Sequence, residues 1–185
     1  EALALLSPLV EAVRVRLGDV VYAVNPTEDG SLAQAAVAAL KAAGMTVATA
    51  ESLTGGLIAA TMVEVPGASE VVKGGFVTYQ SVAKTMLLGV PAETIDRCNV
   101  VSPEVAVAMA QGARARLGVD VAVSATGLAG PGGGTPERPV GTVYLGVATQ
   151  AGTYPIRLAL TGSRDRIRQL TVKHALAAIL REARQ

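Results

Sequence analysis

The chain has 185 residues, half of them hydrophobic, and a formal net charge of +1 at neutral pH. This length suits one globular domain with a substantial core, and the small net charge gives no sign of a nucleic-acid or membrane-surface partner. With one cysteine, one phenylalanine and no tryptophan, the composition excludes a disulfide framework, a cysteine-based metal site and an aromatic platform for stacking bases.

The sequence contains no apolar run of about 18 residues, the length that spans a membrane, and no segment resembling a signal peptide. We therefore expect a cytoplasmic protein with no membrane partner. The first residue is glutamate rather than methionine, so we expect the chain to be a fragment of a longer protein.

The first part of the chain differs in character from the rest. A helix-like stretch from Leu9 to Leu17 and a short strand over 20–24 precede a polar, turn-rich segment over 25–30. We interpret residues 1–29 as the tail of a preceding domain plus a linker, and residues 30–185 as the main domain.

Helices and strands alternate along the main domain. In chain order, we expect a helix over 32–43 capped by Ser31 and ended by Gly44, a strand over 45–50, a helix over 57–63, a strand over 75–79, a helix over 82–88, a helix over 103–117, a strand over 119–126, two strands over 140–149 and 153–160 joined as a hairpin, and a long helix capped by Ser163. This order predicts an α/β protein, a three-layer α/β/α fold with a mixed, mostly parallel sheet.

Ser52 follows a β-branched apolar run and precedes an apolar stretch with helical spacing, so it lies at a strand-to-helix turn. The first backbone N–H groups of a helix lack partners and attract developing negative charge. A serine at such a turn is commonly a helix cap, and Ser52 taken alone favours capping over catalysis.

Lys84 changes the interpretation of Ser52. With Ser81 as the cap, Lys84 is the third residue of its helix, where a capping box places Glu or Gln and the helix dipole disfavours a cation. A helix dipole, dry surroundings and a nearby arginine would all lower the pKa of the ammonium, as a lysine base requires. Ser52 and Lys84 then have the parts of a nucleophile pair. The alternative is a solvated lysine on a surface helix.

Residues 127–136 form a glycine-rich loop. Glycines let backbone N–H groups approach a ligand and form anion-binding nests. The loop leads into a strand rather than a helix, so it is neither a dinucleotide-binding fingerprint nor a P-loop, and a surface loop without a ligand remains an alternative. Thr126 stands just before it, at a strand end where open α/β sheets bind ligands.

The last helix carries His174, the only histidine, at a spacing that predicts a packed face, and the chain lacks the partners for a catalytic triad or a zinc site. Arginines at the start of this helix are electrostatically misplaced unless an anion docks there. Alternatively, Asp165 pairs with them at the surface.

Taken together and in order, five segments resemble the C-terminal domain of the CinA (competence/damage-inducible protein) family over about residues 30 to 185. The segments are Ala50–Gly56, Gly75–Tyr79 with Ala83-Lys84, Gly127–Gly134, Pro139–Val143, and Gly162-x-Arg164. Each segment is weak by itself, whereas the ordered set is specific. One departure is Leu53, where the family often has cysteine.

The resemblance implies a nicotinamide mononucleotide deamidase that needs no metal or cofactor, with Ser52 as nucleophile, Lys84 as its base and Tyr79 relaying or orienting protons. It also implies a small pyridine mononucleotide as partner, with Thr126 and Arg164 in contact with it. From the residues, we expect an acyl-enzyme whose oxyanion is held by N–H groups near Gly55 and Gly56. The full set of expected substrate-binding residues is Thr54, Gly55, Gly56, Thr126, Gly127, Gly130 and Arg164.

Other interpretations stay open from the sequence. A non-catalytic nucleotide-sensing module would keep the glycine loop and Arg164 but lack a working pair of serine and lysine. A DNA-associated competence factor, which the family name suggests, has no basic face or stacking aromatics to support it. The sequence leaves open whether the chain forms a homo-oligomer and whether Glu51 has a structural or a chemical role.

Overall fold

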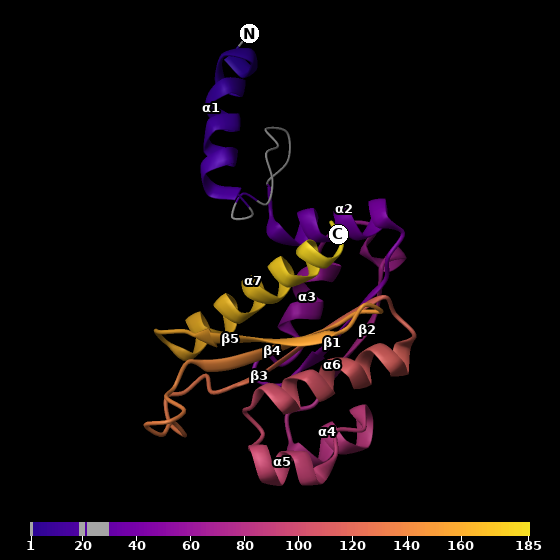
Figure 1. The fold of residues 1–185 in the computed structure, drawn as a ribbon, viewed down its shortest axis with the longest axis vertical. Helices are drawn as coiled ribbons and strands as arrows, with labels where there is room; N and C mark the ends of the chain where they lie inside the picture. The colour runs from indigo at the N-terminus through magenta and orange to yellow at the C-terminus, as the bar shows by residue number, and fades with distance from the viewer. Residues whose placement is uncertain (1, 19–20, 22–29) are drawn as a thin grey trace.

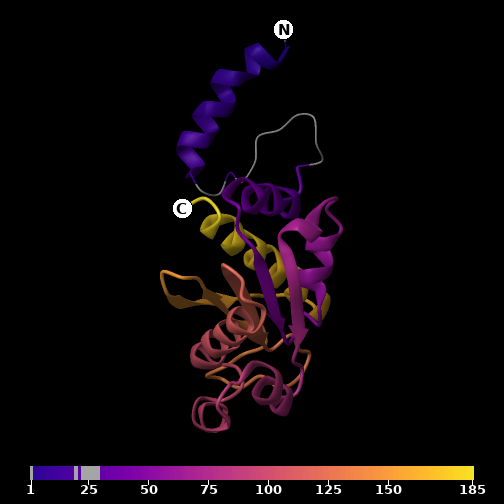
Figure 2. The ribbon, with the colours of Figure 1, turned by 90° about the vertical axis from the view of Figure 1, so that its right-hand side faces the viewer.

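The computed structural model describes residues 2–18, 21 and 30–185 of the chain. Helix α1 (Ala2–Leu17) begins earlier than the helix predicted over 9–17. Figure 1 and Figure 2 both show α1 beyond helix α2 (Leu32–Ala43), away from the sheet.

Most of the segment before residue 30 lies outside the described residues. The strand predicted over 20–24 is described only at Val21, which is in no strand, and the predicted linker only at Gly30. The domain boundary between residues 29 and 30 therefore stays a prediction.

A five-stranded mixed sheet forms the centre of the fold, with strand order β2-β1-β3-β4-β5. Strand β1 (Val47–Glu51) pairs in parallel with β2 (Val72–Val77) on one side and β3 (Val121–Gly127) on the other. Strand β4 (Thr142–Ala148) is antiparallel to both β3 and β5 (Thr153–Ala159). All strands except β4 therefore run in one direction, and the predicted mixed, mostly parallel sheet is confirmed.

Helices cover both faces of this sheet, which confirms the predicted three layers (Figure 1). The α7 face carries α2, α3 (Leu57–Val63) and α7 (Arg164–Glu182), and the α6 face carries α4 (Ser81–Leu88), α5 (Ala92–Cys98) and α6 (Pro103–Leu117). A short 3-10 helix, η2 (Ala68–Glu70), precedes β2.

Each face has its own apolar cluster. The cluster on the α7 face includes Leu40, Ile58 and Ile179, and the cluster on the α6 face includes Val105 and Met109, all completely buried. Strand β1 contributes to both clusters, because successive side chains of a strand point to opposite faces. All five residues of β1 are buried, because helices cover both faces of the sheet.

Apart from α1, η2 and shifts of one or two residues at the ends of elements, two differences from the predicted elements stand out. Strand β2 lies about three residues before the strand predicted over 75–79, because its Val72 pairs with Val47 at the start of β1. Helix α5 was not expected, and none of its residues is fully buried, so its sequence lacks the apolar stripe that predicts a helix.

Strands β1, β2, β3 and β5 all end at the same side of the sheet, which we call the carboxyl edge. Four segments meet there: the turn over 52–56 after β1, residues 78–80 after β2, the loop over 128–141 after β3, and residues 160–163, which lead into α7. In open α/β sheets this edge is where ligands bind.

Among the described residues, no helix is both long enough and apolar enough to cross a lipid bilayer.

Close packing of α6 on the sheet generates a testable prediction. A Cβ atom added at Gly146 would lie 2.2 Å from the Ala106 carbonyl oxygen, which already accepts a hydrogen bond from the Ser124 hydroxyl at 2.6 Å. We expect Gly146→Ala to lower the free energy of unfolding by about 1–3 kcal/mol through overpacking, measured by chemical denaturation. A Cβ at Gly132 meets nothing within 4 Å, so Gly132→Ala is the control, and equal stabilities of the two variants would contradict the prediction.

Candidate active site

Ser52 and Lys84 lie in direct contact at the carboxyl edge. The Lys84 Nζ donates a hydrogen bond to Ser52 Oγ at 3.2 Å and another to the Thr78 carbonyl oxygen at 2.5 Å. The Lys84 side chain is completely buried and Ser52 is 9% exposed. A hydroxyl and an amine are thus held together where only the hydroxyl side meets solvent.

The end of β1 fixes the position of Ser52. Its N–H donates to the Ala125 carbonyl of β3 at 2.9 Å, and its own carbonyl accepts the Gly55 N–H at 3.1 Å, which closes a tight turn. Gly55 and Gly56 adopt positive φ angles of 63° and 95°, a conformation that glycine tolerates without strain. The N-cap of α3 is Gly56, so helix capping does not account for Ser52.

Glu51 performs the capping instead. Its buried carboxylate accepts the N–H groups of Ile58 and Ala59, at 3.0 and 2.9 Å, and the Thr49 hydroxyl at 3.1 Å. A carboxylate suits the positive end of a helix. Its contacts give Glu51, whose role the sequence left open, a structural function: it anchors α3 directly after the turn that carries Ser52.

Lys84 reaches Ser52 from the first turns of α4. The N-cap of this helix is Gln80 rather than the expected Ser81, so Lys84 is its fourth residue and not its third. Burial lowers the pKa of Lys84 from 10.5 to about 8 because the charged ammonium loses its hydration. Of the three causes expected from the sequence, which were the helix dipole, dry surroundings and a nearby arginine, the dry surroundings account for this shift.

A cavity of about 370 Å³ opens in front of Ser52, within the size range of small-molecule sites. The sequence-predicted residues that line it are Ser52, Tyr79, Thr126, Gly127, Gly130 and Arg164. Thr54, Gly55 and Gly56 do not line the cavity, and the Gly55 N–H is already engaged by the Ser52 carbonyl. Gly55 is therefore not available as the expected oxyanion donor.

Arg164 connects two walls of this cavity. Its Nη1 donates to the Gly130 carbonyl at 2.8 Å, and its Nη2 donates to the Tyr79 hydroxyl at 3.3 Å. The Tyr79 side chain is 58% exposed, so it lies at the mouth of the cavity. The Thr126 hydroxyl donates to the Val100 carbonyl at 2.8 Å, which ties the end of β3 to the segment before α6.

Arg168 is a site residue that the sequence analysis missed. Its Nε donates to the Leu53 carbonyl and its Nη2 to the Thr54 carbonyl, both at 3.0 Å. The available signal was its spacing, because Arg168 follows Arg164 by four residues and both therefore lie on one side of the helix.

Two other expectations for α7 differ from the structure. His174 is exposed rather than packed, because the buried residues of α7 leave it on the outer side of the helix. Asp165 takes part in none of the ion pairs that the described residues form, so the arginines near it are not held by a surface network. Among the described residues, no group of three metal-ligating side chains comes together.

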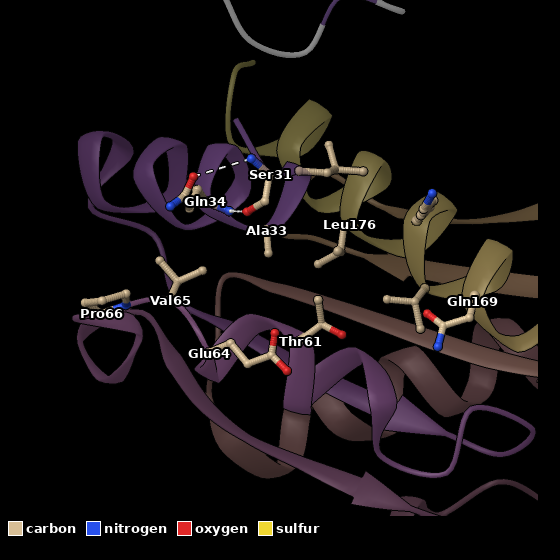
Figure 3. Close-up of a pocket in the computed structure, with 12 residues that line it drawn as sticks. Ser31, Ala33, Gln34, Thr61, Glu64, Val65, Pro66, Gln169 and Leu176 are labelled. Atoms are coloured by element: carbon tan, nitrogen blue, oxygen red, sulfur yellow. Dashed lines mark hydrogen bonds between the residues drawn. The ribbon is translucent and has the colours of Figure 1, made fainter. Parts of the chain in front are cut away.

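A second cavity, of about 470 Å³, lies between α2, α3 and α7 (Figure 3). Polar side chains from all three helices point toward it, including Gln34, Thr61, Glu64 and Gln169. It shares no lining residue with the cavity at Ser52 and contains no nucleophile and base in contact. The chemistry of the carboxyl edge, rather than cavity size, makes the Ser52 cavity the candidate active site.

The model of the CinA C-terminal domain matches residues 29–183. A "putative competence-damage inducible protein" of Caldanaerobacter subterraneus is 44% identical over 187 residues, covering 100% of this chain and 45% of that protein. A namesake from Symbiobacterium thermophilum is 45% identical over 190 residues, covering 98% and 44%. The chain thus spans less than half the length of these curated relatives.

Solved structures agree with the sequence matches. The competence/damage inducible protein CihA from Agrobacterium tumefaciens is 40% identical, with a TM-score of 0.80, and the match covers 88% of this chain and 99% of that chain. A CinA superfamily protein from Escherichia coli is 30% identical, with a TM-score of 0.80, and the match covers 90% and 98%.

The buried amine generates a prediction about stability and pH. The folded-state pKa of Lys84 is lowered, so the unfolded chain binds this proton more tightly, and burial of Lys84 costs most below about pH 8. We expect Lys84→Met to raise the melting temperature at pH 7, and the gain to shrink as pH rises from about 8 toward 10.5.

Lys73→Met, at an exposed lysine, is the matched control and should show no such trend. A gain for Lys84→Met that is constant across this pH range would contradict a depressed pKa.

Proposed function

The chain belongs to the CinA C-terminal domain family, and from that premise we propose that it hydrolyses the carboxamide of nicotinamide mononucleotide to nicotinic acid mononucleotide and ammonia. The observation that carries the proposal is the 3.2 Å contact between the buried Lys84 amine and Ser52 Oγ at the base of a ligand-sized cavity. The proposed substrate is the one that the resemblance to this family implies, and the contact between Lys84 and Ser52 supports the proposed chemistry.

The first half of the reaction is acylation of Ser52. Neutral Lys84 takes the hydroxyl proton as Ser52 Oγ attacks the carboxamide carbon, and a tetrahedral oxyanion forms. The C–N bond then breaks, and the Lys84 ammonium returns the proton to the departing nitrogen, which leaves as ammonia. A pKa of about 8 suits both steps, because a base near the working pH exists in both protonation states.

The second half is hydrolysis of the ester. The space vacated by ammonia admits a water molecule, whose proton passes to Lys84 as the oxygen attacks the acyl carbon. Collapse of the second oxyanion breaks the bond to Ser52 Oγ, which recovers its proton from Lys84. Over both halves one amide and one water become one carboxylic acid and one ammonia.

We assign the mouth of the cavity to the phosphate end of the substrate. Arg164 offers a planar set of N–H donors, two of which are used by the protein, and the Tyr79 hydroxyl lies beside it. A guanidinium binds phosphate with charge-assisted hydrogen bonds. In this arrangement Tyr79 orients the substrate, and no contact between Tyr79 and Ser52 or Lys84 is among those of the described residues.

A nucleotide-sensing module is the competing function. Such a module would use the cavity and Arg164, but it would have no need for a buried lysine that, within the described part of the chain, has no carboxylate partner at hydrogen-bond distance. Burying a cation costs stability. A catalytic role for the neutral amine accounts for this cost, whereas a sensing role does not.

The pair can be tested by mutation. We expect Ser52→Ala and Lys84→Ala each to abolish ammonia release from nicotinamide mononucleotide, and the double variant to be no worse than either single one, because the two groups act as a unit. The measurement is a coupled ammonia assay, with free nicotinamide as the substrate control. Wild-type rates in either single variant would discard this mechanism and favour the sensing module.

The phosphate contact can be tested by substrate comparison. We expect Arg164→Ala to lower kcat/KM for the mononucleotide at least about tenfold, or ~1.4 kcal/mol of transition-state binding. The phosphate-free riboside should lose little, because it never made the contact, and Arg164→Lys should recover part of the loss. Equal losses on both substrates would show that Arg164 acts through its bonds to Gly130 and Tyr79 instead.

A further inference from the structure

The Arg168 side chain binds the backbone of the turn after Ser52, and not the side chains of that turn. One guanidinium donates to two successive carbonyl oxygens, those of Leu53 and Thr54, at 3.0 Å each. These bonds come from α7, on the opposite face of the sheet from α4 and Lys84 (Figure 1). Both carbonyls therefore point toward the α7 face.

Peptide geometry then fixes the N–H groups of the turn. In a planar trans peptide the N–H of one residue points opposite to the carbonyl of the residue before it. The Thr54 and Gly55 N–H groups must therefore point away from Arg168. The Gly55 N–H does so, because it donates to the Ser52 carbonyl at 3.1 Å.

The Thr54 N–H also points away from Arg168, and it has no partner among the described residues. Thr54 is completely buried, and its N–H donates to no group among the described residues, as is also true of the Leu53 N–H. Buried N–H groups without a partner are rare in proteins and call for a ligand atom or a water. Leu53 lines the cavity beside Ser52, and Thr54, which does not line it, is the next residue of the same turn. The two N–H groups therefore belong to the two residues that directly follow the nucleophile.

We infer that the N–H groups of Leu53 and Thr54 bind the oxyanion, and that Arg168 is the positioning residue that keeps the Thr54 donor aimed at it. The inference rests on the proposed acylation of Ser52. It moves the oxyanion site from the expected Gly55 and Gly56 to the two residues directly after the nucleophile. Preorganised donors of this kind are worth most because they need no rearrangement during the reaction.

The first test compares two arginines of one helix. Arg168→Ala should lower kcat for the mononucleotide at least about tenfold, part of the 10²–10³ lost when an oxyanion donor is removed, while KM changes less than about threefold. Arg166→Ala is the matched control, because Arg166 is exposed and should retain wild-type kinetics. A loss in KM alone, or none, would overturn the inference.

The second test does not depend on the substrate. Diisopropyl fluorophosphate phosphorylates an activated serine: Ser52 Oγ attacks phosphorus, its proton passes to Lys84, and fluoride leaves. In the five-coordinate transition state the phosphoryl oxygen gains negative charge and needs the same donors. We expect Arg168→Ala to react at least about tenfold more slowly than wild type across the pH range, with the apparent pKa of the reaction unchanged and Ser52→Ala unreactive. If the wild-type protein reacts with diisopropyl fluorophosphate but releases no ammonia from nicotinamide mononucleotide, the proposed substrate is wrong and this inference still stands.

Three outcomes of the second test would overturn the inference: an unreactive wild type, a variant as fast as wild type, or a slow variant restored at high pH. The last would mean that Arg168 acts on Lys84. If circular dichroism shows that the Arg168→Ala variant is unfolded, the Arg168→Lys variant is used in its place. Lysine keeps the charge but lacks the two parallel donors, so the same slowing at unchanged pKa is expected.

Discussion

A lysine amine buried against a serine hydroxyl is the interaction on which this structure depends. Among the described residues the Lys84 amine bonds only to Ser52 and to the Thr78 carbonyl, and no carboxylate lies at hydrogen-bond distance. Burial disfavours its charged form and lowers its pKa to about 8. Such a group needs a rigid and dry setting. The sheet edge, the first turns of α4 and the tight packing of α6 together provide it.

The site is assembled from segments that are far apart in the chain. Ser52 and Lys84 are 32 residues apart, and Arg168 lies 115 residues after Leu53. The parallel strands bring the first two segments to one edge, and the start of α7 joins them to the glycine-rich loop. Two arginines one helical turn apart make these connections, so α7 serves as the frame that holds the site together.

The sequence predicted most of the architecture but only part of the site. Periodicity and caps identified α2, α6, α7 and the hairpin, because each has an apolar stripe or a clear terminal signal. Helix α5 has neither an apolar stripe nor a side-chain cap, so the sequence did not reveal it. The sequence suggested the pairing of Ser52 with Lys84 from a capping register that the structure shifts by one residue. The backbone bonds of Arg168 could not be predicted, because they depend on carbonyl directions that leave no trace in residue identity. The exposure of His174 was missed for a similar reason: a single spacing does not establish which side of a helix is packed.

Glu51 and Ser52 are neighbours in sequence, yet they serve opposite faces of the sheet. The carboxylate of Glu51 reaches α3, while Ser52 contacts Lys84 of α4. The alternation of side chains along the strand therefore keeps the Glu51 carboxylate away from the Lys84 amine. A carboxylate beside Lys84 would favour its ammonium form and silence it. The site therefore depends on which residues of β1 face which side of the sheet. Over evolutionary time, gaining or losing one residue in β1 would be more harmful than most replacements, since it would exchange the two neighbours while every functional side chain remained present.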